Sequence, residues 1–320
     1  MSTTRGQFKA TVLANVPLCR EHFRLVLRAD GFPPTEPGQF VQVACRDLDR
    51  SMSDAVELDW QPGDRLSAEM DLELRAPLAV LRRPFSLAGR RDVGGGAVEL
   101  DIIHRVVGVG THWMSQLQSG DAVHLIGPLG NTFTLPGDGE IALLIGGGVG
   151  IPPMIYLAEA LARRGNAAVA FAGALTRDLL PLMITGEPAG AEPRPIIDEF
   201  ARHQIPTVIT TDDGSFGYRG FVTQALDEYL DTHRTGPTPV LYTCGPEPMM
   251  KRIADIAKRR GLQCQIAVER AMACGMGTCQ SCCIRLKKPD PNQPPLVGKD
   301  WAYRLACTDG PVFRARDLLW

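Results

Sequence analysis

The chain has 320 residues, which is enough for two or three domains with hydrophobic cores of their own. Its formal net charge of −2 argues against a nucleic-acid partner, because no basic excess is available to neutralise phosphates. No apolar stretch is long enough to cross a bilayer, and residues 1–16 lack the apolar segment of a secretory signal. We therefore expect a cytoplasmic protein that binds neither nucleic acid nor membrane.

The first part of the chain, residues 1–136, predicts an antiparallel β-barrel. Short runs of alternating apolar and polar residues are separated by turn signals such as Pro37-Gly38 and Pro62-Gly63. The expected strands cover residues 7–13, 23–28, 39–44, 97–103 and 122–126. Many short strands with regular turns are typical of a small barrel. Residues 46–78 are acidic and less regular, and they are a candidate insertion on the barrel rim.

From residue 137 onward, strands alternate with helices. Strands are expected at residues 141–145, 167–172, 207–211 and 240–243, and helices at 152–161, 224–229 and 248–259. This alternation predicts a parallel α/β domain over residues 137–260. Residues 261–320 form a third, small module. The predicted fold class is thus β plus α/β: a barrel, a nucleotide-type domain and a terminal module.

Four cysteines of the terminal module have the spacing of a plant-type [2Fe–2S] site. Cys274, Cys279 and Cys282 lie in one glycine-rich loop, and Cys307 follows after 24 intervening residues. Zinc is the alternative, but structural zinc usually takes two close pairs of ligands, and Cys307 has no close second ligand in the sequence. Cys283, beside Cys282, leaves a smaller ambiguity.

A glycine-rich loop, Gly146-Gly147-Gly148-Val149-Gly150, follows a predicted strand and opens a predicted helix. Glycines at such a place let backbone N–H groups approach a pyrophosphate, although Ile151 stands where the third glycine of the dinucleotide fingerprint would fall. Two further segments each follow a strand, where ligands of open α/β sheets bind: Asp212, and Cys244-Gly245-Pro246. Both could equally be ordinary turns. Arg177 and Asp178 follow the second strand and do not decide between NADP and NAD.

Two segments of the barrel offer groups that could bind a flavin or a phosphate, and His104 on a third segment is expected to be a satisfied histidine, because its spacing to the other histidines does not suit a metal site. Arg83-Pro84-Phe85-Ser86 combines a cation for a phosphate with an aromatic ring and a hydroxyl, although an exposed arginine beside a core phenylalanine would look the same. Ile103-His104-Arg105 lies on a later strand. Gly110-Thr111 opens a helix expected at residues 113–117, whose N-terminus could receive a second phosphate.

Together these motifs resemble the ferredoxin-reductase-like flavoproteins. The terminal module, with Glu269 to Cys282 and residues 306–313, is similar to the iron–sulfur electron-transfer subunits of NAD-linked dihydroorotate dehydrogenases. The resemblance implies FAD, a [2Fe–2S] cluster and NAD as cofactors. It assigns FAD to Arg83, Pro84, Phe85, Ser86, Ile103, His104, Arg105, Gly110 and Thr111, NAD to Gly146, Gly147, Gly148, Val149, Gly150, Cys244, Gly245 and Pro246, and the cluster to Cys274, Cys279, Cys282 and Cys307. Asp212 is added to the NAD set because of its position after a strand.

The resemblance implies an oxidoreductase relay for pyrimidine biosynthesis. Electrons would come from an FMN-containing dihydroorotate dehydrogenase catalytic subunit, in a heterotetramer with two copies of each chain, and pass through the cluster and FAD to NAD+. Because a flavin exchanges both one and two electrons, it must lie between cluster and nicotinamide. No catalytic base is assigned, and Ser86 and Cys244 are expected to line the hydride path. The alternatives are a reductase subunit serving a hydrogenase, a sulfide dehydrogenase or an oxygenase, and a zinc-stapled interaction module.

Overall fold

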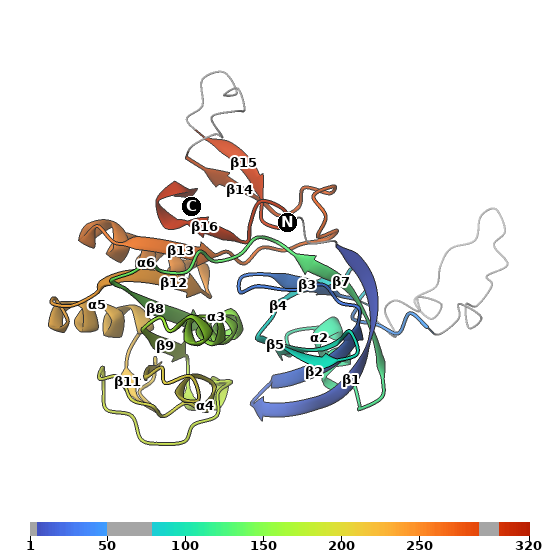
Figure 1. Ribbon diagram of the computed structural model, residues 1–320, viewed down its shortest axis with the longest axis horizontal. Helices are drawn as coiled ribbons and strands as arrows, with labels where there is room; N and C mark the ends of the chain where they lie inside the picture. The colour runs from blue at the N-terminus through green and yellow to red at the C-terminus, as the bar shows by residue number, and fades with distance from the viewer. Residues whose placement is uncertain (1–4, 50–78, 288–300) are drawn as a thin grey trace, which may run out of the picture.

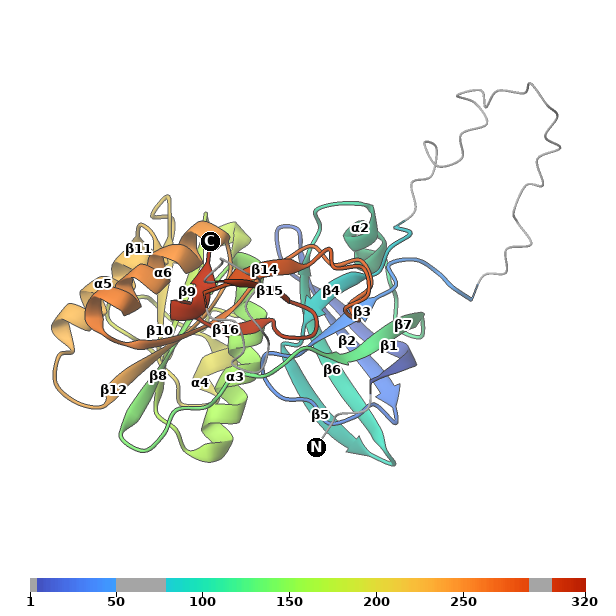
Figure 2. The ribbon, with the colours of Figure 1, turned by 90° about the horizontal axis from the view of Figure 1, so that it is seen from above.

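The computed structural model describes residues 5–49, 79–287 and 301–320. Residues 50–78, which make up most of the candidate insertion, lie outside the described residues. The described residues form three sheets, and they lie in three parts: the first sheet on one side, the second sheet with its helices on the other, and the small third sheet above both (Figures 1 and 2). This confirms the predicted fold class.

The first sheet is antiparallel throughout, in the order β4-β3-β7-β1-β2-β6-β5. Its strands are β1 (Gly6–Cys19), β2 (His22–Asp30), β3 (Phe40–Val43), β4 (Arg83–Ser86), β5 (Gly89–Gly94), β6 (Ala97–Arg105) and β7 (Ala122–Leu129). The two outer strands follow each other in the chain. Between them, the Leu87 N–H donates to the Gln39 carbonyl and the Ala88 N–H to the Asp101 carbonyl, so the sheet curls into a half-barrel around its core.

Helix α2 (Val109–Ser115) packs on this half-barrel, with Met114 fully buried in the barrel core. The helix begins four residues before the predicted start at residue 113. The reason is local. The Thr111 hydroxyl oxygen accepts hydrogen bonds from the N–H groups of Val107 and Gly108, at 2.9 and 3.2 Å. These two N–H groups lie at the N-terminus of the helix, so the helix can begin at Val109.

The second sheet has the order β11-β10-β9-β8-β12-β13-β16 and is parallel except for β16, which runs antiparallel to β13. Its strands are β8 (Glu140–Gly147), β9 (Ala168–Ala174), β10 (Thr207–Thr211), β11 (Tyr218–Arg219), β12 (Thr238–Cys244), β13 (Gln263–Ala267) and β16 (Val312–Arg314). The predicted strands at residues 141–145, 167–172, 207–211 and 240–243 are confirmed. Strands β11, β13 and β16 were not predicted.

Helices cover both faces of this sheet, which explains why its strands are apolar without alternation. Along β8, Ala142 and Leu144 pack towards α3 (Ile151–Arg164) and α4 (Asp198–Ala201), whereas Leu143 and Ile145 pack towards α5 (Val222–Thr232) and α6 (Glu247–Arg260). The three helices predicted in this part, at residues 152–161, 224–229 and 248–259, are confirmed in α3, α5 and α6. No helix in the described ranges has both the length and the apolar character needed to span a membrane.

The third sheet belongs to the end of the chain. It consists of β14 (Cys283–Leu286), β15 (Ala302–Leu305) and β17 (Leu318–Leu319), in the order β15-β14-β17. Strands β13 and β16 of the same terminal segment lie in the second sheet, so the small sheet is anchored on the edge of the large one. The division of the chain into residues 1–136, 137–260 and 261–320 stays a prediction.

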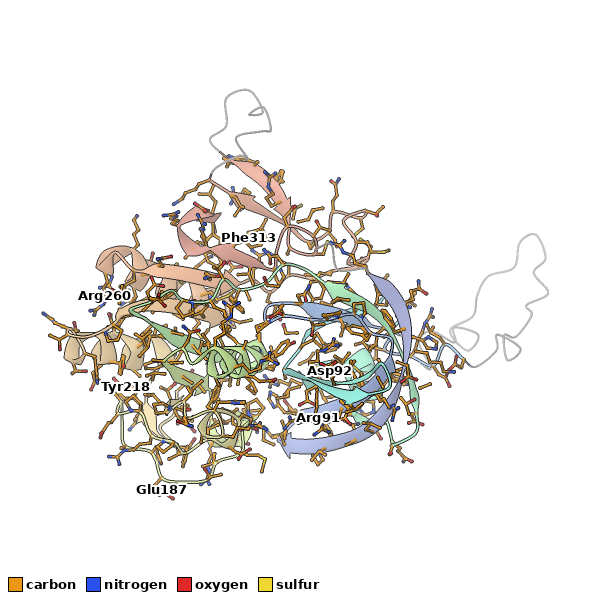
Figure 3. All side chains as sticks on the ribbon, in the orientation of Figure 1. Arg91, Asp92, Glu187, Tyr218, Arg260 and Phe313 are labelled. Atoms are coloured by element: carbon orange, nitrogen blue, oxygen red, sulfur yellow. The ribbon has the colours of Figure 1, made fainter. Side chains whose placement is uncertain are left out.

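Two contacts lock the three parts together. Tyr156 of α3 is 1% exposed and packs among the barrel core, where its hydroxyl donates to the Thr35 carbonyl at 2.8 Å and lies 2.7 Å from the Thr35 hydroxyl. Phe313 of β16, labelled in Figure 3, shares a core with Phe40 of the barrel, with α5 and α6, and with Cys282 and Cys307. Packed side chains therefore hold the three parts together where they meet.

Candidate functional site

The second sheet has its topological switch point between β8 and β12. From β8 the chain builds β9 and β10 on one side and then returns to place β12 on the other. In the register of these two parallel strands, Cys244 lies opposite Gly146. The glycine-rich loop and the Cys244-Gly245-Pro246 turn therefore leave the sheet side by side, at the edge where open α/β sheets bind ligands.

The glycine-rich loop can reach this position only because Gly150 has no side chain. A methyl group on Gly150 would lie 2.1 Å from the Cys244 carbonyl oxygen and 2.4 Å from the Gly245 nitrogen. The loop thus lies directly on the turn, and α3 begins immediately after it. Because Pro152 and Pro153 have no N–H and the Ile151 N–H donates to the Gly148 carbonyl, backbone donors for a pyrophosphate must come from the glycine-rich loop itself.

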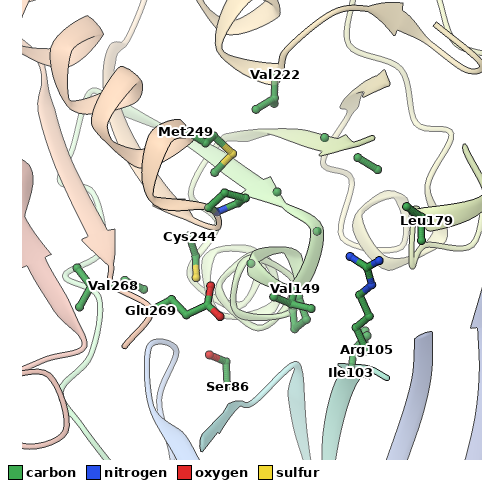
Figure 4. Close-up of a pocket in the computed structure, with 18 of the residues that line it drawn as sticks. Ser86, Ile103, Arg105, Val149, Leu179, Val222, Cys244, Met249, Val268 and Glu269 are labelled. Atoms are coloured by element: carbon green, nitrogen blue, oxygen red, sulfur yellow. The ribbon is translucent and has the colours of Figure 1, made fainter. Parts of the chain in front are cut away.

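A cavity of about 930 Å3 opens in front of this loop and is lined by all three parts of the molecule (Figure 4). Most of the residues predicted to bind cofactors line it. They are Pro84, Phe85, Ser86, Ile103, His104, Arg105 and Thr111 from the FAD set, and Gly147, Gly148, Val149, Gly150, Asp212, Cys244 and Pro246 from the NAD set. The structure thus brings the two predicted sets together around one space.

Four residues of these sets do not line the cavity: Arg83, Gly110, Gly146 and Gly245. The Arg83 guanidinium donates to the Leu81 carbonyl at 2.9 Å and is exposed. Gly110 packs against Cys45 and Ala79, where it lets α2 approach the barrel core. Their assignment to cofactors stays a prediction.

His104 is the clearest sign that the barrel side of the cavity receives a polar ligand. It is 1% exposed, and neither ring nitrogen has a hydrogen-bond partner. Phe85 lies edge-on to its ring, with centroids 6.2 Å apart. Burial, and then the charge of His22, lowers the pKa of His104 to about 4, so the imidazole is neutral and keeps one donor and one acceptor. Buried polar atoms without partners are rare in proteins and fit a heteroatom-rich ring such as a flavin.

Where the two sets meet, Ser86, Cys244 and Glu269 face the same space. In Figure 4, the Glu269 carboxylate points into the region between the Cys244 and Ser86 side chains. Burial, and next the charge of Glu269, raises the pKa of Cys244 to about 12, so its side chain stays a neutral thiol. Sequence analysis did not identify Glu269 as a site residue, although it begins the segment that carries the family resemblance.

Arg177 and Asp178 do not line the cavity. The Arg177 guanidinium lies over the Phe216 ring, 4.9 Å from its centroid, and the Asp178 carboxylate pairs with Arg20 at 3.2 Å. Asp212 does line the cavity, and burial followed by the charge of Asp213 raises the pKa of its carboxyl group. Of the charged residues considered at the ends of the second and third strands, Asp212 is the one that faces the cavity.

The four predicted cluster ligands come together at the junction of the barrel and the large sheet. The Cys274 sulfur accepts hydrogen bonds from the N–H groups of Met276 and Cys279, both at 3.4 Å. Burial raises the pKa of Cys307 to about 12, and a hydrogen bond with Cys282 and the charge of Cys274 act in the same direction. Hydrogen bonds from Ser281, and then from Cys274, lower the pKa of Cys279 to about 6. The remote fourth cysteine thus lies beside the loop, as the spacing requires.

The cysteines are arranged in pairs: Cys274 with Cys279, and Cys282 with Cys307. In the part of the chain that the structure describes, no group of three or more His, Cys, Asp or Glu side chains could hold a single metal ion. Two pairs fit two irons that each take two thiolates. Cys283 is exposed, and its thiol donates to the Gln280 carbonyl at 3.1 Å.

Comparisons with known proteins agree with this geometry. The iron–sulfur cluster binding domain of dihydroorotate dehydrogenase B matches residues 269–319, and an oxidoreductase NAD-binding domain matches residues 144–255. The dihydroorotate dehydrogenase B (NAD+) electron transfer subunit of Streptococcus mutans is 34% identical over 260 residues, covering 80% of this chain and 88% of that protein. The chain belongs to this family of electron transfer subunits.

Two other members of the family cover three quarters or more of the chain. The electron transfer subunit of Caldanaerobacter subterraneus subsp. tengcongensis is 29% identical over 317 residues, which is 99% of this chain and 100% of that protein. The subunit of Geobacillus thermodenitrificans is 36% identical over 243 residues, covering 75% and 80% of the two chains.

Among solved structures, the NADH-dependent reduced ferredoxin–NADP oxidoreductase studied for flavin-based electron bifurcation is similar to the present chain. It is 25% identical, with a TM-score of 0.67 over 97% of this chain and 90% of that one. The Amycolatopsis cytochrome P450 reductase GcoB shares the fold, with a TM-score of 0.56 and 24% identity, over 81% and 68% of the two chains. The domain matches and the first of these structures support the predicted set of cofactors: FAD, a [2Fe–2S] cluster and NAD.

Proposed function

We propose that the chain carries electrons from a partner dihydroorotate dehydrogenase through a [2Fe–2S] cluster and FAD to NAD+. The observation that carries this proposal is the cavity at the junction of the three parts, with barrel residues on one side and the switch-point loop on the other. Two of the predicted cluster cysteines, Cys282 and Cys307, share a core with Phe40, which also lines this cavity, so the cluster site would adjoin it.

The residues have separate tasks in this proposal. A bound flavin would supply the exchange between electron pairs and single electrons. Pro84, Phe85, Ser86 and the 103–105 segment would hold it, with the neutral His104 ring offering a donor and an acceptor. Gly147 to Gly150 would hold the pyrophosphate of NAD. The neutral Cys244 thiol and the Ser86 hydroxyl would line the region between flavin and nicotinamide, together with the Glu269 carboxylate.

We further propose that the partner is an FMN-containing catalytic subunit in a heterotetramer with two copies of each chain. The loop from 274 to 282 has one buried and one exposed side: Cys282 is 1% exposed, whereas Cys279 and Met276 are exposed. An electron donor would approach the exposed side, because there the cluster ligands are accessible from solvent. The cytoplasmic location expected from the sequence stays a prediction.

The test is purification of the native complex. We expect a coloured protein with one FAD, two irons and two acid-labile sulfides per chain, which forms orotate from dihydroorotate while reducing NAD+. A complex that reduces NAD+ with another donor, and not with dihydroorotate, would contradict the substrate assignment. A colourless protein with one zinc ion per chain would contradict the relay itself.

A second candidate is a reductase subunit for another redox enzyme, such as a hydrogenase, a sulfide dehydrogenase or an oxygenase. The 25% identity to a chain of the NADH-dependent reduced ferredoxin–NADP oxidoreductase structure, over 97% of this chain, shows that a similar chain serves another redox reaction and favours this alternative. The same purification distinguishes the two, because the identity of the bound partner decides the donor.

A further inference from the structure

A buried glutamine without hydrogen-bond partners lies between the barrel and the cysteine loop. Gln42 of β3 is 0% exposed. Within the described residues, neither its amide nitrogen nor its amide oxygen has a hydrogen-bond partner. Because such groups cost stability when they are left unpaired, a fully buried amide of this kind indicates that a bound group completes the site.

The direction in which Gln42 points follows from the strand. In β3, Val41 and Val43 belong to the barrel core, so Phe40 and Gln42 point to the opposite face. That face is covered by the terminal module, since Phe40 packs in one core with Cys282 and Cys307.

The Gln42 amide lies against the cysteine loop itself. A methyl group on Gly275 would lie 2.8 Å from Gln42 Cγ and 3.0 Å from its amide nitrogen. Gly275, with φ of +69°, follows Cys274 directly, so only a residue without a side chain fits both the backbone turn and the glutamine. The amide nitrogen is thus placed at the start of the loop that carries three of the four predicted ligands.

The same strand also adjoins the flavin side. In the antiparallel register of β3 and β4, Gln42 lies opposite Pro84 and Phe40 lies opposite Ser86. Strand β3 is therefore the element between the predicted flavin strand and the predicted cluster loop.

We propose that the Gln42 side-chain amide donates a hydrogen bond to a sulfur atom of the cluster, on its flavin-facing side. This inference rests on the proposed function, because it requires a cluster at Cys274, Cys279, Cys282 and Cys307. An amide N–H near sulfur stabilises the more negative, reduced cluster and so raises its reduction potential. In this role, Gln42 raises the reduction potential of the cluster and fixes the orientation of the cluster towards the flavin.

The test uses the full-length protein with its cofactors and compares it with Gln42→Leu. We expect the equilibrium constant for cluster reduction to fall about tenfold, which is about 59 mV for a one-electron couple. The potential is read by a redox titration followed by electron paramagnetic resonance. Proton couplings that exchange in D2O, measured on the reduced cluster, should lose the contribution of the amide.

Gln39→Leu is the matched control. Gln39 is also buried, but its amide oxygen accepts from the Glu36 N–H at 3.0 Å and its nitrogen donates to the Gly130 carbonyl at 3.2 Å. Its replacement should lower the melting temperature and leave the cluster potential unchanged. Gln42→Met, closer to glutamine in length, is measured as a second variant, should the leucine variant fail to retain iron.

The possible outcomes are distinct. If the variants at Gln42 keep iron and sulfide, and their potential and exchangeable couplings equal those of the wild type, the inference is overturned. If both variants lose the cluster while Gln39→Leu keeps it, a sulfur contact that holds the cluster is supported. Wild-type protein without acid-labile sulfide would instead refute the proposed function.

Discussion

Replacing Gly150 by alanine tests whether the glycine-rich loop must lie on the Cys244 turn. The new methyl group would start 2.1 Å from the Cys244 carbonyl oxygen, and ordinary contact begins at 3.4 Å, so loop and strand end must separate by about 1.3 Å. Because both partners are backbone, no side chain can rotate to relieve the clash. Overpacking of this kind costs about 1–3 kcal/mol of unfolding free energy.

The functional loss in Gly150→Ala should exceed the loss of stability. A displacement of about 1 Å at groups that position a substrate can lower a rate about 10²-fold. We therefore expect the reduction of bound flavin by NADH, followed by stopped-flow absorbance, to slow by about that factor, with iron content unchanged. In the control Gly137→Ala, the methyl group would lie 3.6 Å from a Glu140 oxygen, which is ordinary contact, so stability should change by less than about 0.5 kcal/mol. Wild-type rates of flavin reduction in Gly150→Ala would refute the assignment of this loop to NAD.

Three further predictions concern the cysteines and the contact between the parts. Cys307→Ala should lose iron and acid-labile sulfide, whereas Cys283→Ala should keep both; loss in Cys283→Ala alone would contradict the ligand assignment. Burial raises the pKa of Cys264 from 9.0 to about 12, so above pH 9 the unfolded chain releases a proton that the native state retains, and native stability falls as pH rises. We therefore compare the free energy of unfolding, measured with denaturant, at pH 8 and pH 10. Between these pH values it should fall by about 1 kcal/mol less in Cys264→Ala than in the wild type, and an equal fall in both proteins would contradict the burial argument. Tyr156→Phe should lower the unfolding free energy by about 1–3 kcal/mol, because it leaves the buried Thr35 groups without their partner; an unchanged melting temperature would show that this bond does not hold the parts together.

The sequence predicts those features that depend on neighbours along the chain. Strand β10 has the predicted bounds, 207–211, because its apolar run and its flanking turns are local signals. The cysteine spacing placed Cys307 beside the loop, since the chemistry of the cluster requires a fourth thiolate. By contrast, the start of α2 was missed because it depends on a hydroxyl that accepts from backbone N–H groups three and four residues earlier.

Glu269, Gln42 and Tyr156 could not be identified from the sequence, because their roles come from contacts between distant segments. In the sequence, Gln42 reads as an ordinary strand residue, and only the structure shows that it lies against Gly275. Likewise, Tyr156 reads as a core residue of its own domain, but the structure places it in the core of the barrel. The period of a strand or helix shows that a side chain is buried, but it does not show which part of the molecule buries it.

The different exposure of the four predicted cluster cysteines gives the site a direction. Cys282 and Cys307 are each 1% exposed and share a core with Phe40 and Phe313, whereas Cys279 is exposed. Because Phe40 also lines the cavity and lies opposite Ser86, the buried side of the cysteine group is continuous with the predicted flavin strand. In the proposed relay, an electron that enters at the exposed side would therefore leave through packed protein towards the cavity.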